Sequence, residues 1–322
     1  MAVPLTQFIL RRVLQALPLL LLISIGVFAL IHSVPGGPLT VFLSNPQVRP
    51  EDIERLQRSL GLDRPLTEQY ARWLLNFVRG DWGFSFADGR PVVDRILERI
   101  PATIELMGAG FLLAGILALP LGVFTALHRR TAFDYTCTIL AFVGISMPVY
   151  WLGLMLQLGF GLHLRWLPLS GRQSFGGGDA LDHLLHLIMP ACVLAVVHVA
   201  VWSRYLRSSM IDALAQPYMT TARSKGLTNV LVLMRHALRN ALLPLVTAVS
   251  MDVAFLLSGA VITESIFAWP GVGALFVDSI FRRDYTVIMG VLMIGAVSVI
   301  LVNLVADVLY AYIDPRIRVE VE

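Results

Sequence analysis

Metal-ligand spacing occurs at one place in the chain, where Asp182 and His183 are followed by His186. Histidines three residues apart share one face of a helix and can point at the same ion. Zinc sites, however, are built from a fixed constellation that often includes cysteine or a further histidine. Two histidines and one aspartate beside an apolar stretch fall short of it. We therefore expect no bound metal, with a site on these three residues as the alternative.

Lys225 is the only lysine among the 25 basic residues, which excludes several kinds of chemistry. A nucleotide-binding P-loop needs Gly-Lys-Ser or Gly-Lys-Thr after a spaced glycine, whereas Lys225 lies between Ser224 and Gly226. No Ser-His-Asp set and no pair of carboxylates can be assigned to a shared cleft. We expect no catalytic residue, no enzyme activity and no cofactor on this chain. Any ATP-driven work would need ATP and Mg²⁺ bound by another subunit.

The composition predicts a polytopic membrane protein, because 57% of the 322 residues are hydrophobic and only 15% are charged. Soluble domains carry about 25% charged residues. A helix needs about 20 apolar residues to cross a bilayer. The segments that qualify are residues 13–31, 106–127, 135–162, 187–203, 241–263 and 285–306. The third is long enough to tilt, or to kink at Pro148. The expected fold is all-α, with six transmembrane helices.

Two carboxylates lie in or next to the fifth of these segments: Asp252 is inside it, and Glu264 follows it directly. An ionised carboxylate inside a membrane is costly, so we expect Asp252 to face a cavity or a partner rather than lipid. A proton relay is the alternative, but it would need further ionisable groups. For Glu264 we expect a structural hydrogen bond, with a ligand contact as the alternative. His198, in the fourth segment, is expected to pair between helices.

The distribution of basic residues predicts the orientation. With the N-terminus in the cytoplasm, 12 basic residues fall in cytoplasmic segments and four in the short outer loops. The other nine lie in residues 34–100, where nine acidic residues balance them. A long segment of this kind translocates largely regardless of its charge. We therefore predict that both termini are cytoplasmic and that residues 34–100 are outside.

The spans and breakers divide the chain into regions. These are an N-terminal segment with the first span (1–33), an extracytoplasmic helical domain (34–100), a transmembrane domain (101–318) with a long cytoplasmic loop (204–240), and a C-terminal tail (319–322). Apolar residues at helical spacing predict three helices in the extracytoplasmic domain, near residues 50–61, 66–78 and 92–100.

The cytoplasmic loop is predicted to contain a short helix, a glycine turn and a second helix. Pro217 suits the first turn of a helix and Gly226 suits its C-terminal stop. Thr228 suits the cap of the next helix, which would continue into the fifth span. An ordinary positive-inside loop would carry the same charges, so charge alone assigns it no function.

The loop also carries a family pattern: Thr220, Thr221 and Ala222, then Gly226, then residues 235–244. Further motifs follow the same family in residues 61–66, 80–85, 99–106, 146–151, 166–171 and 267–273. Together they resemble the permeases of binding-protein-dependent ABC transporters, and more narrowly the dipeptide, oligopeptide and nickel branch. The resemblance runs from about residue 8 to residue 318. Two positions depart from it: the general loop motif begins with an acid and two alanines, whereas this chain has Thr220 and Thr221 at the first two places and only Ala222 matches.

The resemblance implies an importer made of several subunits in a bacterial inner membrane. Two permeases would enclose a pore, two cytoplasmic ATPase subunits would bind ATP and Mg²⁺, and an extracytoplasmic binding protein would deliver a dipeptide or oligopeptide. Residues 217–227 would be the coupling element that docks on an ATPase subunit. The residues implied for coupling are Pro217, Tyr218, Thr221, Ala222, Arg223, Lys225 and Gly226. Those considered for the pore or substrate path are Ser146, Met147, Asp252 and Glu264.

The alternative is an ion-coupled secondary transporter, or an intramembrane enzyme, that works without an ATPase. Such a transporter predicts inverted repeats and several charges near the middle of the membrane. The sequence contains no convincing repeat, and Asp252 stands nearly alone among its apolar neighbours. The sequence does not identify the solute, since glutathione-like compounds and chelated nickel are carried by similar permeases.

Overall fold

The computed structural model describes residues 5–33, 61–254 and 260–313. Within these residues the chain is helical and has no β-strand, only an isolated bridge between Phe84 and Pro91. The all-α prediction is therefore confirmed. The chain forms two compact units, Met1–Ala102 with Gly271–Glu322, and Thr103–Pro270. Helix α5 (Val92–Leu127) contributes its first turns to one unit and the remainder to the other.

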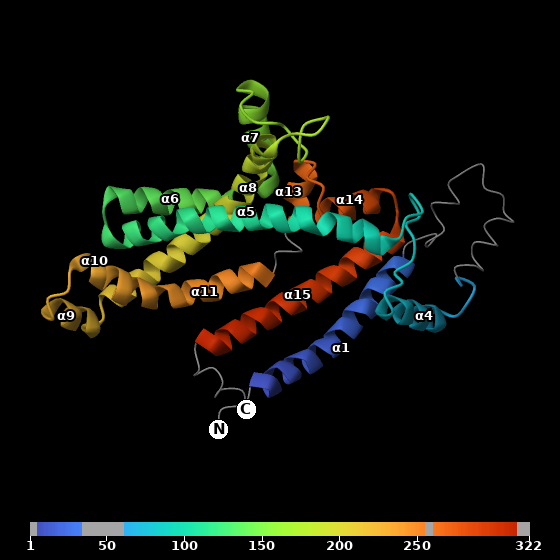
Figure 1. The fold of residues 1–322 in the computed structure, drawn as a ribbon, viewed down its shortest axis with the longest axis horizontal. Coiled ribbons are helices and arrows are strands. Elements are labelled where there is room, and N and C mark those ends of the chain that lie inside the picture. The colour runs from blue at the N-terminus through green and yellow to red at the C-terminus, as the bar shows by residue number, and fades with distance from the viewer. Residues whose placement is uncertain (1–4, 34–60, 255–259, 314–322) are drawn as a thin grey trace. The chain divides into compact units, whose positions relative to one another are not determined.

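The first unit is built on two long antiparallel partners, α1 (Leu5–His32) and α15 (Tyr285–Ile313), which lie side by side in Figure 1. Phe28 and Ile31 of α1 are buried against Tyr285, Ile288 and Met289 of α15. The unit also contains α4 (Leu66–Val78) and α14 (Val272–Phe281). A second apolar cluster packs the start of α5 against α14 and α15, so α5 is fixed where it begins.

The second unit holds the loop of interest and most of the remaining helices. They are α6 (Ala132–Ser146), α7 (Val149–Leu156), the π-helix η2 (Gln157–His163), α8 (Ala180–Leu214), α9 (Pro217–Ser224), α10 (Asn229–Val232), the π-helix η3 (Leu233–Leu238), α11 (Arg239–Ala254) and α13 (Val261–Ile266). Helices α6 and α11 pack on α8. Helix α8 is therefore the central element of this unit.

Glycines let α5 approach α8 closely. A Cβ atom at Gly110 would lie 2.8 Å from Cβ of Leu194, and one at Gly122 would lie 2.8 Å from Cβ of Leu206. Such distances are shorter than packed side chains allow, so only a residue without a side chain fits at either position. Small residues at a crossing are the usual means by which apolar helices associate within a membrane.

Four helices are long and apolar enough to cross a membrane among the residues that the structure describes. They are Ile9–His32, Val92–Leu127, Ala180–Leu214 and Tyr285–Val305. They correspond to the first, second, fourth and last of the predicted spans.

The predicted third span is not straight. Helices α6 and α7 meet at a bend of 102°, so the pair counts as a fifth span only if the bent arrangement crosses as one. The bend falls at Pro148, as the sequence predicted. Proline lacks an N–H and pushes the residue before it out of the helical region. Met147 accordingly takes φ −75° and ψ 124°.

The predicted span at residues 241–263 is only partly visible. Helix α11 ends at Ala254 and α13 begins at Val261, and residues 255–259 lie outside the described residues. In residues 34–100, the second predicted helix is confirmed as α4 and the third as the start of α5. The first, at 50–61, falls almost entirely outside the described residues.

Candidate functional site

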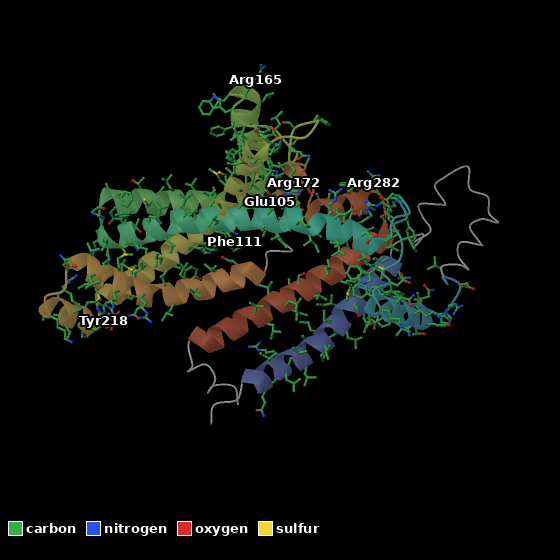
Figure 2. The ribbon with its side chains drawn as sticks, viewed as in Figure 1. Glu105, Phe111, Arg165, Arg172, Tyr218 and Arg282 are labelled. Atoms are coloured by element: carbon green, nitrogen blue, oxygen red, sulfur yellow. The ribbon has the colours of Figure 1, made fainter. Side chains whose placement is uncertain are left out.

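Helix α9 occupies the loop for which the sequence predicted a short helix starting at Pro217. That residue takes the first helical position, and Gln216 before it is extended with ψ 146°, as a following proline requires. Met219 and Ala222 turn inward and are only 1% and 6% exposed. The remaining side chains of the helix face solvent; among them are Tyr218 (Figure 2), Thr220, Thr221, Arg223 and Ser224. The helix thus has an anchored face and an open polar face.

The anchored face of α9 belongs to the main apolar cluster of its unit. Met219 and Ala222 are buried together with Ala213 of α8, Val232 of α10 and Ala237 of η3. Ala222, one of the residues implied for coupling, thus packs against its own chain and helps to fix the position of α9.

Gly226 ends the helical segment in the manner predicted. Its φ is +78°, and its N–H donates to the carbonyl of Arg223 at 2.9 Å. A Cβ atom at this position would meet no other atom within 4 Å. The requirement for glycine here is therefore a matter of backbone conformation, since residues with side chains rarely adopt positive φ.

Tyr218 and Asn240 connect the two ends of the loop. The side-chain amide of Asn240 donates to Tyr218 Oη at 3.2 Å and to the carbonyl of His236 at 2.9 Å. Met219 and Asn240 were not among the predicted functional residues. The motif at 235–244 was the available signal for Asn240, and methionine at a buried helical position was the signal for Met219.

The side chain of Asp252 contacts two residues of the same chain, Trp202 and His198. Trp202 Nε1 donates to its Oδ2 at 2.6 Å, and His198 Nδ1 lies 3.4 Å from the same oxygen. Phe111 of α5 (Figure 2) covers both partners, with ring centroids 4.6 Å from His198 and 5.3 Å from Trp202. The interhelical pairing predicted for His198 is confirmed. Asp252 links α11 to α8.

Glu264 is fully buried, and the hydroxyl of Thr103 donates to its Oε1 at 2.8 Å. The backbone N–H of Trp269 also donates to the carbonyl of Glu264, at 2.8 Å. The structural hydrogen bond predicted for this carboxyl group is therefore present. A residue without exposed surface offers a solute no direct contact in this conformation.

The residues of the alternative metal site, Asp182, His183 and His186, make other contacts within the chain. His183 places Nε2 against Glu105 and Nδ1 2.8 Å from the carbonyl of Arg172. Arg172 in turn donates through Nε and Nη2 to Glu105 Oε2, at 3.1 and 2.6 Å (Figure 2). His186 Nδ1 contacts the carbonyl of Asp182 at 2.8 Å. Both nitrogens of His183 are thus occupied within the chain, by an ion-pair cluster that closes the loop before α8.

Ser146 and Met147 lie at the bend between α6 and α7. Ser146 is exposed and Met147 is half-buried. Both line an open hollow together with Phe142, Pro148 and Trp151. The surface that they share is mainly apolar, and a role in the solute path stays a prediction.

An ion pair fixes α6 to α8 near the end of α8 that leads to α9. Arg207 donates through Nε and Nη2 to the two carboxylate oxygens of Asp134, at 2.6 and 2.8 Å. The N–H of Arg130 adds a hydrogen bond to Asp134 Oδ2 at 3.0 Å. Asp134 is only 2% exposed, so its charge is held almost entirely by these donors.

A second polar cluster holds the first unit together. Asp284 is fully buried and accepts from the Ser85 hydroxyl, from Arg95 Nη1 at 3.2 Å and from the Phe86 N–H at 3.1 Å. Arg95 also pairs with Asp88 at 3.4 Å. The pKa of the Asp88 carboxyl is lowered: burial alone would raise it, but a hydrogen bond from the Arg90 N–H and the charge of Arg95 outweigh burial.

The comparisons with known proteins agree with this arrangement. Residues 118–319 match the family described as binding-protein-dependent transport system inner membrane component, and residues 5–107 match the N-terminal region of the same kind of component. The chain is 42% identical over 313 residues to oligopeptide transport system permease protein AppB of Bacillus subtilis (strain 168), covering 97% of this chain and 99% of the relative.

Two further relatives come from Escherichia coli (strain K12). Dipeptide transport system permease protein DppB is 39% identical over 334 residues, covering 97% of this chain and 98% of the relative. Glutathione transport system permease protein GsiC is 37% identical over 312 residues, covering 97% and 99%. From both matched regions and from relatives of this identity over nearly the whole length, the chain belongs to the binding-protein-dependent transport system inner membrane component family.

Proposed function

We propose that this chain is the permease subunit of an ATP-driven importer of dipeptides or oligopeptides. Its partners are a second, similar permease, two cytoplasmic ATPase subunits that bind ATP and Mg²⁺, and an extracytoplasmic solute-binding protein. The peptide substrate rests on the relatives, two of which are named for oligopeptide and dipeptide transport. The same family includes a glutathione permease, so the solute is proposed as a class.

The observation that carries the coupling role is the two-sided character of α9. Met219 and Ala222 fix one face to the core of the same chain, while Tyr218 and Arg223 lie on the exposed face. A coupling helix must be packed rigidly on its own chain and must leave a surface that the ATPase subunit can contact. Because α9 is packed in this way, a movement of the ATPase subunit would displace α8 and α11 and would not merely bend α9.

The proposed topology has six spans with both termini in the cytoplasm, and residues 34–100 outside. The four to five apolar helices of the described residues support a polytopic protein, and the inner-membrane family supports its location. The fifth span would be the segment at 241–263, of which α11 forms the described part. In this topology, α9 and its exposed Arg223 lie on the cytoplasmic side, where the ATPase subunits are.

Assembly with an ATPase is the point to test first. The tagged permease is expressed with and without its ATPase subunits and purified from membranes. We expect the ATPase subunits to co-purify and the permease alone to hydrolyse no ATP. Hydrolysis by the isolated chain above that of an empty-vector preparation would contradict the subunit assignment and favour a chain that works alone.

The docking face is tested with a matched pair of charge reversals. Arg223→Glu, on the open face of α9, is expected to weaken co-purification of the ATPase subunits. Arg165→Glu, at an arginine that is also exposed and lies in the loop after η2 (Figure 2), is expected to leave co-purification unchanged. Equal recovery from both variants would show that Arg223 is not part of the docking surface.

A further inference from the structure

A cavity of about 260 Å³ lies between α5, α6 and α8. Most of its wall is aliphatic: it includes Leu113, Leu117 and Leu121 of α5, Leu140 of α6 and Val199 of α8. Both cysteines of the chain, Cys137 and Cys192, also line it. The cavity plays no part in the coupling site, in the Asp252 cluster or in the Glu264 hydrogen bond.

Water is a poor occupant for this space. An apolar cavity of about 150 Å³ already stays dry and takes up hydrocarbon, because water needs two to four polar partners. The wall residues run along α8 from Cys192 to Arg207. At 1.5 Å per residue this corresponds to roughly 22 Å, whereas one leaflet of a bilayer core is about 15 Å thick. The apolar part of this cavity, called the slot below, is therefore long enough for one acyl chain.

One end of the slot is cationic. Arg204 and Arg207 line it there, together with Thr138, and the same three residues line an adjoining hollow with Tyr205 and Ser208. Arg207 is neutralised by Asp134. Arg204 is exposed, and its guanidinium lies 4.3 Å from the centroid of the Phe142 ring.

Arg204 forms no ion pair with any residue that the structure describes. A guanidinium is attracted to the face of an aromatic ring, and its planar fork suits a phosphate. The hydroxyls of Tyr205 and Ser208 add neutral donors beside it. The cavity thus combines an aliphatic slot with an uncompensated cation and hydroxyl donors at one end.

We propose that this cavity binds one anionic phospholipid, with an acyl chain in the slot and the phosphate at Arg204. The choice of leaflet rests on the topology proposed above, and the proposal does not depend on the solute. By the charge pattern, the Arg204 end faces the cytoplasmic leaflet, whose anionic lipids are drawn to basic pockets between helices. A lipid held between α5, α6 and α8 would brace the bundle from which α9 extends.

The test measures lipid retained by the purified full-length chain. Native mass spectrometry is performed after adding phosphatidylglycerol, phosphatidylethanolamine or inorganic phosphate. We expect phosphatidylglycerol to bind in preference to phosphatidylethanolamine. Arg204→Gln is expected to weaken the binding of phosphatidylglycerol by about tenfold, the effect of losing a charge-assisted hydrogen bond. Arg239→Gln, at an exposed arginine outside both hollows, is the control and should change nothing.

A second pair of variants tests the slot itself. Leu140 is 62% exposed and lines the cavity, whereas its neighbour Ile139 is 61% exposed and lines the hollow at the α6–α7 bend instead. Leu140→Trp should obstruct the slot and reduce lipid binding, while Ile139→Trp should not. Because both side chains are largely exposed, neither substitution overpacks the core.

The cysteines provide an independent readout. Bound phosphatidylglycerol should slow the reaction of Cys137 and Cys192 with a membrane-permeant maleimide, and Arg204→Gln should remove that protection. Equal binding of both lipids, or unchanged binding by Arg204→Gln, would overturn the proposal. Protection by inorganic phosphate alone would reduce the site to an anion site and also overturn it. Cross-linking from Cys137 to the second permease in the assembled complex would show that a protein surface fills the slot.

Discussion

Gly226 shows how far one residue can be interpreted from sequence and geometry together. The sequence predicted a glycine stop after a short helix, and the structure adds the reason, which is a φ of +78°. The space around its Cα is open, so a substitution costs strain in the backbone and not a clash. The position can therefore be tested, because a residue that tolerates positive φ should retain the peptide uptake that a β-branched residue reduces.

Gly226→Val is expected to distort the turn after α9 and to reduce peptide uptake. The strain is about 1–2 kcal/mol for a side chain at positive φ. Gly226→Asn is the control, because asparagine enters this region more readily, and it should retain most of the uptake. Uptake is measured beside permease abundance and ATPase co-purification. Normal uptake by the valine variant at normal abundance would mean that this turn does not transmit the motion.

Asp252→Asn is expected to preserve peptide uptake. The asparagine side-chain oxygen can still accept from Trp202 Nε1, so the link between α8 and α11 survives without a charge. Asp252→Leu removes the acceptor and leaves the buried indole N–H without its partner, which should lower permease abundance. Loss of uptake by the asparagine variant at normal abundance would instead favour an ionisable role for Asp252.

Residue types were easier to predict than residue partners. A structural hydrogen bond at Glu264 was predicted from the sequence, but its partner Thr103 is 161 positions away. Ser85 and Asp284 are separated by 199 positions. A single sequence contains no signal for such pairs. The motifs at 80–85 and 99–106 contain Ser85 and Thr103, but they do not identify the residues to which these two side chains are hydrogen-bonded.

At the scale of elements, local rules worked where a residue restricts the backbone. Pro217 and Gly226 gave the ends of α9, and Pro148 gave the break after α6. They did not give the size of the bend, 102°, because packing of α7 on α8 and α13 decides where the chain goes after the break. The two π-helical segments were also not predicted, since composition does not distinguish a π turn from an α turn.

The clamp between α6 and α8 makes a prediction for a double-mutant cycle. Asp134→Ala leaves Arg207 without its partner, and Arg207→Ala leaves a carboxylate that is 2% exposed. Each single variant should lose about 2 kcal/mol of stability, with the larger loss for Arg207→Ala, because an orphaned buried charge is costly. The double variant should lose less than the sum. Thermal denaturation of the purified permease measures this, and strict additivity would contradict the geometry.

At the scale of the whole molecule, the proposed orientation of the chain in the membrane rests on where its basic residues fall. Composition was sufficient to predict a polytopic helical protein, and the described residues contain four to five suitable helices. The assignment of sides rests on 12 basic residues in segments predicted to be cytoplasmic. Orientation is therefore the property of the whole molecule that an experiment decides most directly.

Single cysteines placed on either side of the membrane test the orientation. In a background with Cys137→Ser and Cys192→Ser, Thr67→Cys on α4 should react with an impermeant thiol reagent added to spheroplasts. Ser224→Cys at the end of α9 should react only after the membrane is opened. Both positions are exposed in the structure, so access to the reagent is limited by the bilayer alone. The reverse pattern would invert the proposed topology.

The π-helix η3 has a consequence for how this loop tolerates changes in length. An α-helix turns by about 100° per residue, and a π-helix contains one residue more in the same span. Removing one residue from Leu233–Leu238 would let the segment relax to an ordinary α-helix. Because a π turn holds one residue more than an α turn over the same rotation, helix α11 would keep its facing toward α8, and Asn240 would stay opposite Tyr218. Removing one residue from the regular helix α11 would instead rotate everything beyond the deletion by about 100°. The loop should therefore tolerate the loss of one residue within η3, where the helix behind it would not.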